Sequence, residues 1–361
     1  MARIVSSPAD ARPVVASLGG NPLAALNGIL ALCPPRQEVK IYLVVSGETA
    51  GRCGPFERAL RFFGLSTEVE LVVVNPDDPR VVREKLQEKL GDWSTRTVYS
   101  GGTRPMAVVL ASWCRRNGGE CWSTDGLVVR RDDGVEAQVP ASKALDLETL
   151  ATLHEAHEVS SVGRPDPPAE KDKAWWERLL TDPEFREKVR QRERSDHCFE
   201  KAVHGLVAGI CAASPPAARH VLGDVTVRRK DPEHSDAPLR ECQLDIVIID
   251  RATRLTVLEV KVSENASTKA RLHLEAAEVG VRAVQYGGMQ ARAGLVTLLE
   301  SRTTKALERE LRDGFPFSPN VEVFGMDELA DAVHLRKESA FGRWLLGPDE
   351  PGGGLTPRAH R

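Results

Sequence analysis

The chain is most constrained by two apolar runs rich in β-branched residues, 243–250 and 255–262, which flank a four-residue polar turn. Runs of this length and composition predict a hairpin of two mostly buried strands. Asp245 interrupts the first run near its start, and Glu259 and Lys261 interrupt the second near its end. Because side chains alternate along a strand, Glu259 and Lys261 share one face. Antiparallel pairing brings Asp245 to the same end of the hairpin, so two carboxylates and an ammonium group converge there.

This charged cluster favours metal-dependent chemistry, because charges inside a protein are costly unless they are paired or bind a metal. Carboxylate oxygens suit Mg²⁺ or Mn²⁺. A bound metal can activate water and stabilise charge on a phosphoryl oxygen, while Lys261 positions or polarises the attacking water. These are the requirements of phosphodiester hydrolysis. Taken alone, the three residues fit equally well a buried ion-pair network that only supports the hairpin.

The sequence upstream of the hairpin supplies a third carboxylate. Apolar residues recur with helical spacing from Phe199 to Ile210, and Glu200 lies at the start of that stripe. The order helix with Glu, strand with Asp, strand with Glu-x-Lys resembles the PD-(D/E)-x-K nuclease superfamily, although Leu244 stands where the superfamily's name has proline. The resemblance implies four catalytic residues, Glu200, Asp245, Glu259 and Lys261. It also implies a metal bound at Asp245, Glu259 and Val260.

The first 150 residues alternate apolar strands with helices, as in a doubly wound α/β sheet. Polar turns follow several predicted strands, at the strand ends where such sheets bind ligands. Glycine lets backbone N–H groups approach a phosphate, and hydroxyl groups and a cation add to such a site. Taken alone, a tight strand-to-helix turn is the simpler explanation of these loops. The candidate binding residues are Gly19, Gly20 and Asn21 after the first strand, Ser46 after the second, and Ser100, Gly101, Gly102, Thr103 and Arg104 after the fourth.

With its Gly-Gly-Thr-Arg loop, this half resembles a CARF domain, the CRISPR-associated Rossmann-like sensor of cyclic oligoadenylates. Coupled to a PD-(D/E)-x-K domain, it resembles the CRISPR ancillary nucleases of type III systems, over nearly the whole chain. The resemblance implies a homodimer with cyclic tetra-adenylate bound across its two-fold axis as an allosteric activator. It also implies metal-dependent cleavage of single-stranded DNA or RNA, or nicking of duplex DNA, in antiviral defence.

The predicted fold is therefore α/β, with a Rossmann-like CARF domain followed by a restriction-endonuclease-like α/β domain. We expect the sensor at residues 1–150 and the nuclease domain at 186–346. A linker with connecting helices is expected at 151–185, because the run 163–173 is rich in proline and charge. The glycine-rich tail at 347–361 is expected to be disordered.

Composition limits the partners and the location. A formal net charge of −3 argues against general affinity of the surface for nucleic acid, so such contacts must be local. Seven cysteines without a C-x-x-C pair favour reduced thiols, and no apolar run approaches a membrane span. We therefore expect a cytoplasmic protein without a membrane segment. Candidate backbone-binding cations are Arg228, Arg229, Lys230, Lys269, Arg271, Arg282 and Arg292.

Trp175 and Trp176 could stack bases, but packing near the domain junction is the favoured interpretation. Two other functions remain open at this point. One is an unregulated nuclease of the restriction or repair type, whose first half docks protein or DNA. The other is a nucleotide-sensing regulatory module without enzymatic activity, in which Asp245, Glu259 and Lys261 form a structural ion network.

Overall fold

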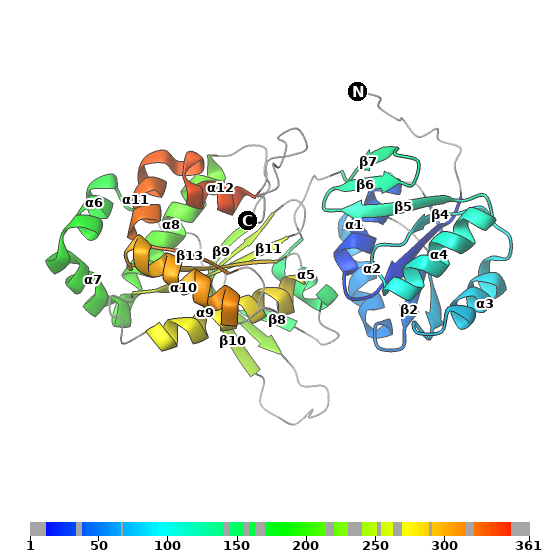
Figure 1. The fold of residues 1–361 in the computed structure, drawn as a ribbon, viewed down its shortest axis with the longest axis horizontal. Coiled ribbons are helices and arrows are strands. Elements are labelled where there is room, and N and C mark those ends of the chain that lie inside the picture. The colour runs from blue at the N-terminus through cyan, green and yellow to red at the C-terminus, as the bar shows by residue number, and fades with distance from the viewer. Residues whose placement is uncertain are drawn as a thin grey trace. The chain divides into compact units, whose positions relative to one another are not determined.

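A computed structural model of the chain forms two compact units, which meet in the sequence between Ser160 and Ser161 (Figure 1). The structure describes residues 12–33, 38–65, 68–140, 145–154, 159–162, 170–213, 220–229, 240–250, 254–262, 269–288, 291–314 and 321–347. Among these residues no helix is long and apolar enough to cross a membrane.

The first unit alternates strands and helices along the chain. Its elements are β1 (Val14–Leu18), α1 (Pro22–Leu32), β2 (Ile41–Ser46), the 3-10 helix η1 (Ala50–Arg52), α2 (Cys53–Phe62), β3 (Val69–Val74), α3 (Pro79–Leu90), β4 (Arg96–Val98), α4 (Arg104–Arg116), β5 (Glu120–Asp125), β6 (Val128–Arg131), β7 (Glu136–Gln138) and α5 (Leu147–His154). Helices α1, α3 and α4 each begin with a polar capping side chain followed closely by proline. Such caps satisfy free backbone N–H groups and fix where each helix starts.

The first sheet has the strand order β3-β2-β1-β4-β5-β6-β7. The five strands from β3 to β5 in this order are parallel. Strands β6 and β7 extend the sheet in antiparallel fashion. The order of the strands reverses between β1 and β4, and the crevice outside the carboxyl ends of two such strands is where open α/β sheets bind ligands.

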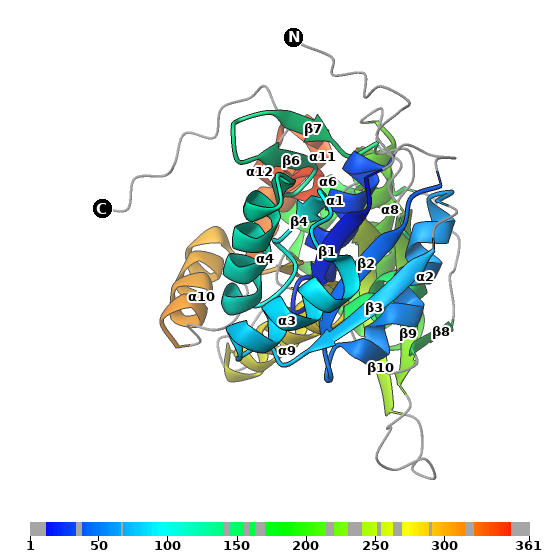
Figure 2. The same ribbon diagram turned by 90° about the vertical axis from the view of Figure 1, so that its right-hand side faces the viewer.

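Helices cover both faces of the first sheet. Figure 2 shows α3 and α4 on one face and α2 on the other. The core under α3 and α4 joins Val15 and Val44 of the sheet to Leu86 and Trp113 of the helices. Helices α1, α2 and α5 contact one another. Strand β1 is buried over its whole length, as expected of a central parallel strand covered on both faces.

The elements that follow form the second sheet and its helices. They are β8 (Val159–Val162), α6 (Lys173–Thr181), α7 (Pro183–Asp196), α8 (Cys198–Ala212), β9 (His220–Arg229), β10 (Arg240–Ile249), β11 (Leu255–Lys261), α9 (Lys269–Gly287), β12 (Arg292–Thr297), α10 (Ser301–Gly314), β13 (Val321–Phe324), α11 (Met326–Leu335), the 3-10 helix η3 (Arg336–Glu338) and α12 (Ala340–Leu346). The strand order is β13-β12-β11-β10-β9-β8. Strands β10 and β11 are antiparallel, whereas β11, β12 and β13 are parallel.

The second sheet also has a core on each face. One core joins α6, α7, α8, α11 and α12 to alternate residues of the strands, among them Ile246 and Leu258. The other joins α9 and α10 to the sheet through Leu295 and Val323. Because neighbouring strand residues point to opposite faces, both runs of the hairpin are apolar almost throughout.

The predicted α/β fold class is confirmed, and the structure adds details that the sequence pattern missed. Arg228 and Arg229 lie in strand β9, not in a loop as expected. Helices α6 and α7, expected among the connecting helices, contribute Trp176, Leu179 and Val189 to the second core. Their apolar residues are sparse among charges, which makes them resemble a linker in sequence. Residues 348–361, for which disorder was predicted, lie outside the described residues.

Candidate functional site

The hairpin of β10 and β11 places three of the predicted catalytic residues at one end of the second sheet. Ile246 pairs with Leu258, and the same register extended by one residue sets Asp245 opposite Glu259. Leu258 enters the core shared with α8. Its neighbour Glu259, and with it Lys261, therefore points to the face that carries α9.

The three charged side chains contact one another. The Lys261 Nζ atom lies 2.6 Å from Glu259 Oε1 and 3.5 Å from Asp245 Oδ2. The backbone N–H of Val260 donates to Asp245 Oδ2 at 2.7 Å. On α9, Arg282 Nη1 lies 3.6 Å from Glu259 Oε2. Asp245 and Glu259 are each only 7% exposed, so the carboxylates are held largely out of water.

Burial and mutual repulsion change the acidity of this cluster. Burial, followed by the charge of Asp245, raises the pKa of Glu259 above its usual range. Burial opposes a charge on Lys261, but the negative charges of Asp245 and Glu259 outweigh it and raise the pKa of Lys261. Lys261 is therefore an ammonium group at neutral pH. It can donate hydrogen bonds to water or phosphate, but it cannot act there as a base.

Glu200 lies in the first turn of α8, and its carboxylate is also largely buried, with 12% of the side chain exposed. Burial, followed by the charge of Asp245, raises the pKa of Glu200 to about 7. The influence of Asp245 means that the helix brings its carboxylate near the end of the hairpin, as predicted. Glu200 Oε2 also lies 3.0 Å from Nδ1 of His197.

Two further residues beside Glu200 were missed in the sequence. Glu193 accepts the backbone N–H groups of Phe199 at 2.5 Å and Glu200 at 3.0 Å, and so caps the start of α8. Between the two helices His197 adopts the left-handed conformation, with φ of 49°. Ligand-type atoms of Glu193, His197 and Glu200 all lie within 4.8 Å of one another. Their spacing of four and three residues, Glu-x-x-x-His-x-x-Glu, is the signal that could have revealed them.

The residues at the end of the hairpin fit a divalent cation. Glu259 Oε2 is buried, and among the described residues it has no hydrogen bond, only the distant ion pair with Arg282. Carboxylates that raise one another's pKa gain from a hard cation with oxygen ligands, such as Mg²⁺ or Mn²⁺. Asp245 and Glu259 would hold it. The Val260 side chain lies in the core, so this residue could reach a metal only through its backbone.

The predicted ligand-binding loops of the first unit meet at the point where the strand order reverses. The loop 19–21 follows β1 and the loop 99–103 follows β4, which are neighbouring parallel strands. Each loop leads into a helix, α1 or α4. Both helix N-termini therefore lie at the same edge of the sheet, where backbone N–H groups favour an anion.

Close backbone contact explains the glycines of these loops. A Cβ added at Gly101 would lie 2.1 Å from the carbonyl oxygen of Ser17, and one at Gly19 would lie 2.8 Å from that of Gly101. The N–H of Gly102 donates to Ser17 Oγ at 2.9 Å. At Gly20, which is exposed, an added Cβ would meet nothing within 4 Å. Gly19, Gly101 and Gly102 therefore hold the two loops together, whereas Gly20 is open to a ligand.

The polar residues of the loops divide in the same way. Asn21 and Thr103 cap α1 and α4, and Ser100 Oγ accepts the N–H of Thr124 at 2.7 Å. Arg104 is exposed at the start of α4. Arg104 is thus the cation of this edge that is available to a ligand phosphate.

Ser46 is tied to the same edge through residues that the sequence did not indicate. Ser46 Oγ lies 3.0 Å from Thr49 Oγ1, which also donates to the carbonyl of Leu18 at 3.1 Å. Arg52 Nη1 donates to the carbonyl of Gly19 at 3.1 Å. Thr49 and Arg52 therefore fix the position of the first glycine loop. No sequence pattern marks them, because both contacts join turns more than thirty residues apart.

The structure assigns other roles to several candidate backbone-binding cations. Arg292 donates to the carbonyls of Trp344 and Leu345 and lies over the Trp344 ring. Arg282 pairs with Glu259 and Glu278, and its Nη1 donates to a backbone carbonyl of β10. Arg228 pairs with Glu241 on the neighbouring strand. The expectation of a phosphate groove is therefore wrong for Arg292, whose guanidinium ties β12 to α12. Lys230, and the side chains of Arg229, Lys269 and Arg271, lie outside what the structure describes.

Comparison with known proteins was made at the level of sequence and of structure. The sequence matches no protein-family model and no curated protein. In structure, the chain is similar to the protein VC1899 from Vibrio cholerae, with a TM-score of 0.64, 13% identity and coverage of 93% of this chain and 98% of that one. It is also similar to Can2 from Sulfobacillus thermosulfidooxidans, solved in complex with cyclic tetra-adenylate, with a TM-score of 0.65, 14% identity and coverage of 90% and 95%.

A third similar structure is a type III CRISPR defence DNA nuclease activated by cyclic oligoadenylate. The TM-score is 0.53 and the identity 18%, and the match covers 91% of this chain but 52% of the nuclease chain. This chain therefore spans about half the length of that nuclease. The predicted resemblance to CRISPR ancillary nucleases with a CARF domain is confirmed at the level of the fold.

Proposed function

We propose that this protein is a metal-dependent nuclease whose activity is switched on by a cyclic oligoadenylate, cyclic tetra-adenylate being the first candidate. The observation that carries the proposal is the buried cluster of Asp245, Glu259 and Lys261 at the end of the hairpin, with Glu200 close by. The fold supports the same conclusion, because one structure that shares it was solved with cyclic tetra-adenylate and another is a nuclease activated by a cyclic oligoadenylate.

The hydrolytic site would work through a division of labour among four side chains. Asp245 and Glu259 hold the divalent cation, which when bound lowers the pKa of water and stabilises charge on a phosphoryl oxygen. Lys261 stays protonated and positions the attacking water or a phosphate oxygen. Glu200, with a pKa of about 7, can take up the proton that the attacking water releases.

The first unit would bind the activator at the edge where its two loops meet. N-termini of α1 and α4 offer N–H groups to phosphates, Gly20 lets the ligand approach the backbone, and Arg104 supplies a cation. A cyclic ligand with repeated units suits a homodimer, in which each subunit offers the same loops across a two-fold axis. Activation then requires that the ligand bind more tightly to the active arrangement than to the inactive one.

The test is cleavage of supercoiled plasmid, single-stranded DNA and single-stranded RNA, with Mn²⁺ or Mg²⁺, with and without cyclic tetra-adenylate. The variants are Glu259→Gln and Lys261→Ala. The control is Lys305→Ala, which removes an exposed lysine of α10. We expect cutting that needs metal and ligand together, is lost in both site variants and is kept in the control.

Each other outcome supports a different alternative. Cutting without the ligand would retain the active site but favour an unregulated nuclease. No cutting under any of these conditions would favour a nucleotide-sensing module in which Asp245, Glu259 and Lys261 serve only structure. The nucleic acid that is cut decides between DNA and RNA as the substrate.

A further inference from the structure

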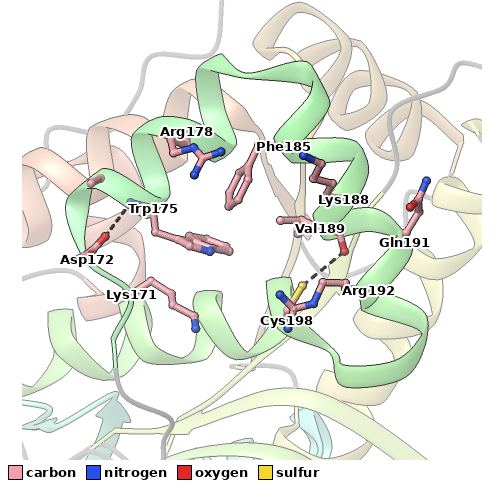
Figure 3. A pocket seen from close by; sticks show the side chains of 11 residues that line it. Lys171, Asp172, Trp175, Arg178, Phe185, Lys188, Val189, Gln191, Arg192 and Cys198 are labelled. Atoms are coloured by element: carbon pink, nitrogen blue, oxygen red, sulfur yellow. Dashed lines mark hydrogen bonds between the residues drawn. The ribbon is translucent and has the colours of Figure 1, made fainter.

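A cavity of about 730 Å³ lies in the second unit between α6, α7 and the start of α8 (Figure 3). Its volume falls within the range of small-molecule sites. The lining residues are Lys171, Asp172, Ala174, Trp175, Arg178, Phe185, Lys188, Val189, Gln191, Arg192 and Cys198. None of these residues belongs to the hydrolytic cluster or to the ligand-binding loops of the first unit.

The cavity is strongly positive in a chain whose net charge is −3. Four of its lining residues are cations: Lys171, Arg178, Lys188 and Arg192. The one carboxylate in the lining, Asp172, accepts the N–H of Trp175 at 2.7 Å and so caps α6. Because a cap already uses this carboxylate, the cations that surround the cavity are available to an anion.

Two aromatic rings line the same cavity. Trp175 is half-buried and meets Trp176 and Phe185 edge-on, with ring centroids 5.2 Å and 5.9 Å away. Trp176 is only 1% exposed and belongs to the core, so it fixes Trp175 from behind. Figure 3 shows the Trp175 and Phe185 side chains beside the open space, with Arg178 close to Phe185. The adjacent tryptophans therefore serve two purposes, one as core and one as a cavity wall.

Cationic and aromatic side chains together match one class of ligand. A nucleotide in a single strand exposes both a phosphate and an unstacked base face, and aromatic rings accept any base by stacking. An acidic peptide would use the cations but not the rings. Duplex DNA keeps its bases stacked inside the helix, where the rings cannot reach them.

We infer that this cavity binds one nucleotide of a single-stranded nucleic acid, with the base against Trp175 and the phosphates near Lys171 and Lys188. The inference rests on the proposed nuclease function and identifies a substrate subsite for it. Cys198, in the wall of the cavity, precedes Glu200 by two residues in α8, about 3 Å along the helix axis. A strand held in the cavity therefore runs close to the carboxylate cluster.

The test measures binding rather than cleavage. Full-length protein carrying Glu259→Gln is titrated, without divalent metal, into a fluorescein-labelled oligothymidine and into an abasic strand of the same length. Fluorescence anisotropy gives the affinity at several salt concentrations. Lys188→Glu is the main variant, because Lys188 is exposed and makes no hydrogen bond or ion pair with described residues. Lys305→Glu on α10 is its matched control.

We expect Lys188→Glu to weaken binding of both strands and to reduce the salt slope by about 0.7, the value for one phosphate contact on a single strand. Trp175→Ala should weaken oligothymidine binding by about tenfold, in the range of one stacked base, and leave the abasic strand unchanged. Lys305→Glu should bind as the parent protein does.

Unchanged affinity in both cavity variants would overturn the inference. Equal competition by polyglutamate would also overturn it and assign the cavity to an acidic polypeptide. Failure of the proposed nuclease function has a different signature, since the protein would then cut nothing in the cleavage assay whatever the binding result. Loss of binding in Lys188→Glu with the abasic preference removed in Trp175→Ala would support the subsite.

Discussion

Replacing Glu200 by glutamine should stabilise the second unit while it abolishes cleavage. Glutamine keeps the shape of the side chain and removes the carboxylate, whose pKa is raised from 4.5 to about 7 by burial and by the charge of Asp245. The folded protein therefore holds the Glu200 proton more tightly than the unfolded chain does. Stability is lost as the pH rises from about 4.5 to about 7, and the full cost of the charged carboxylate is present above that range.

The magnitude follows from the pKa difference. Each tenfold change in acid dissociation is worth about 1.4 kcal/mol, so a rise from 4.5 to about 7 corresponds to about 3 kcal/mol at high pH. Water reaches the 12% of the Glu200 side chain that stays exposed and screens part of this cost. We therefore expect Glu200→Gln to raise the free energy of unfolding by about 1–2 kcal/mol at pH 8 and by much less at pH 5.

Urea unfolding at pH 5 and pH 8, followed by tryptophan fluorescence, measures the difference between wild type and Glu200→Gln. Glu184→Gln is the matched control, since Glu184 is an exposed glutamate in the first turn of α7 and should show no gain that depends on pH. A gain of equal size at both pH values, or a loss at pH 8, would refute the reasoning. Mn²⁺ should narrow the difference, because a cation near Asp245 lowers the cost of charge on Glu200.

Two further predictions test the ligand edge and the fold. Gly101→Ala should abolish binding of cyclic tetra-adenylate, measured by calorimetry, because its Cβ would lie 2.1 Å from the Ser17 carbonyl oxygen, whereas Gly20→Ala, with nothing within 4 Å, should leave the first unit folded and serves as its control. Arg292→Ala should lower the free energy of unfolding by about 2–3 kcal/mol, since it leaves carbonyls at the end of α12 without their donor. Unchanged stability with weakened nucleic-acid binding would instead restore Arg292 to a phosphate groove.

The hairpin could be predicted because its information is local. The two-residue period of a strand fixes which side chains share a face, and the short turn fixes which ends meet. From these two facts the approach of Asp245, Glu259 and Lys261 follows without any knowledge of the rest of the fold. The glycine loops were found for a similar reason, since parallel strands end at one edge of their sheet and place their loops there.

The remainder could not be predicted because the same residue type serves several purposes. A guanidinium in a sequence looks the same whether it binds phosphate or, as Arg292 does, backbone carbonyls more than fifty residues away. Trp175 and Trp176 are neighbours in sequence, yet only the packing of α6 against the sheet decides which of them is buried. Glu193 and His197 take part in the site through a bend between two helices. No periodic pattern records that bend.

The charge of the hydrolytic cluster explains why metal and substrate would depend on each other. Asp245, Glu259 and Glu200, when ionised, outnumber the two cations Lys261 and Arg282 by one charge. A site with this surplus repels a phosphodiester. A divalent cation reverses the surplus to a single positive charge, which one phosphodiester group neutralises. The cluster would therefore hold nucleic acid only with its metal bound, so affinity measured without metal comes from surfaces elsewhere, such as the cavity beside α6 and α7.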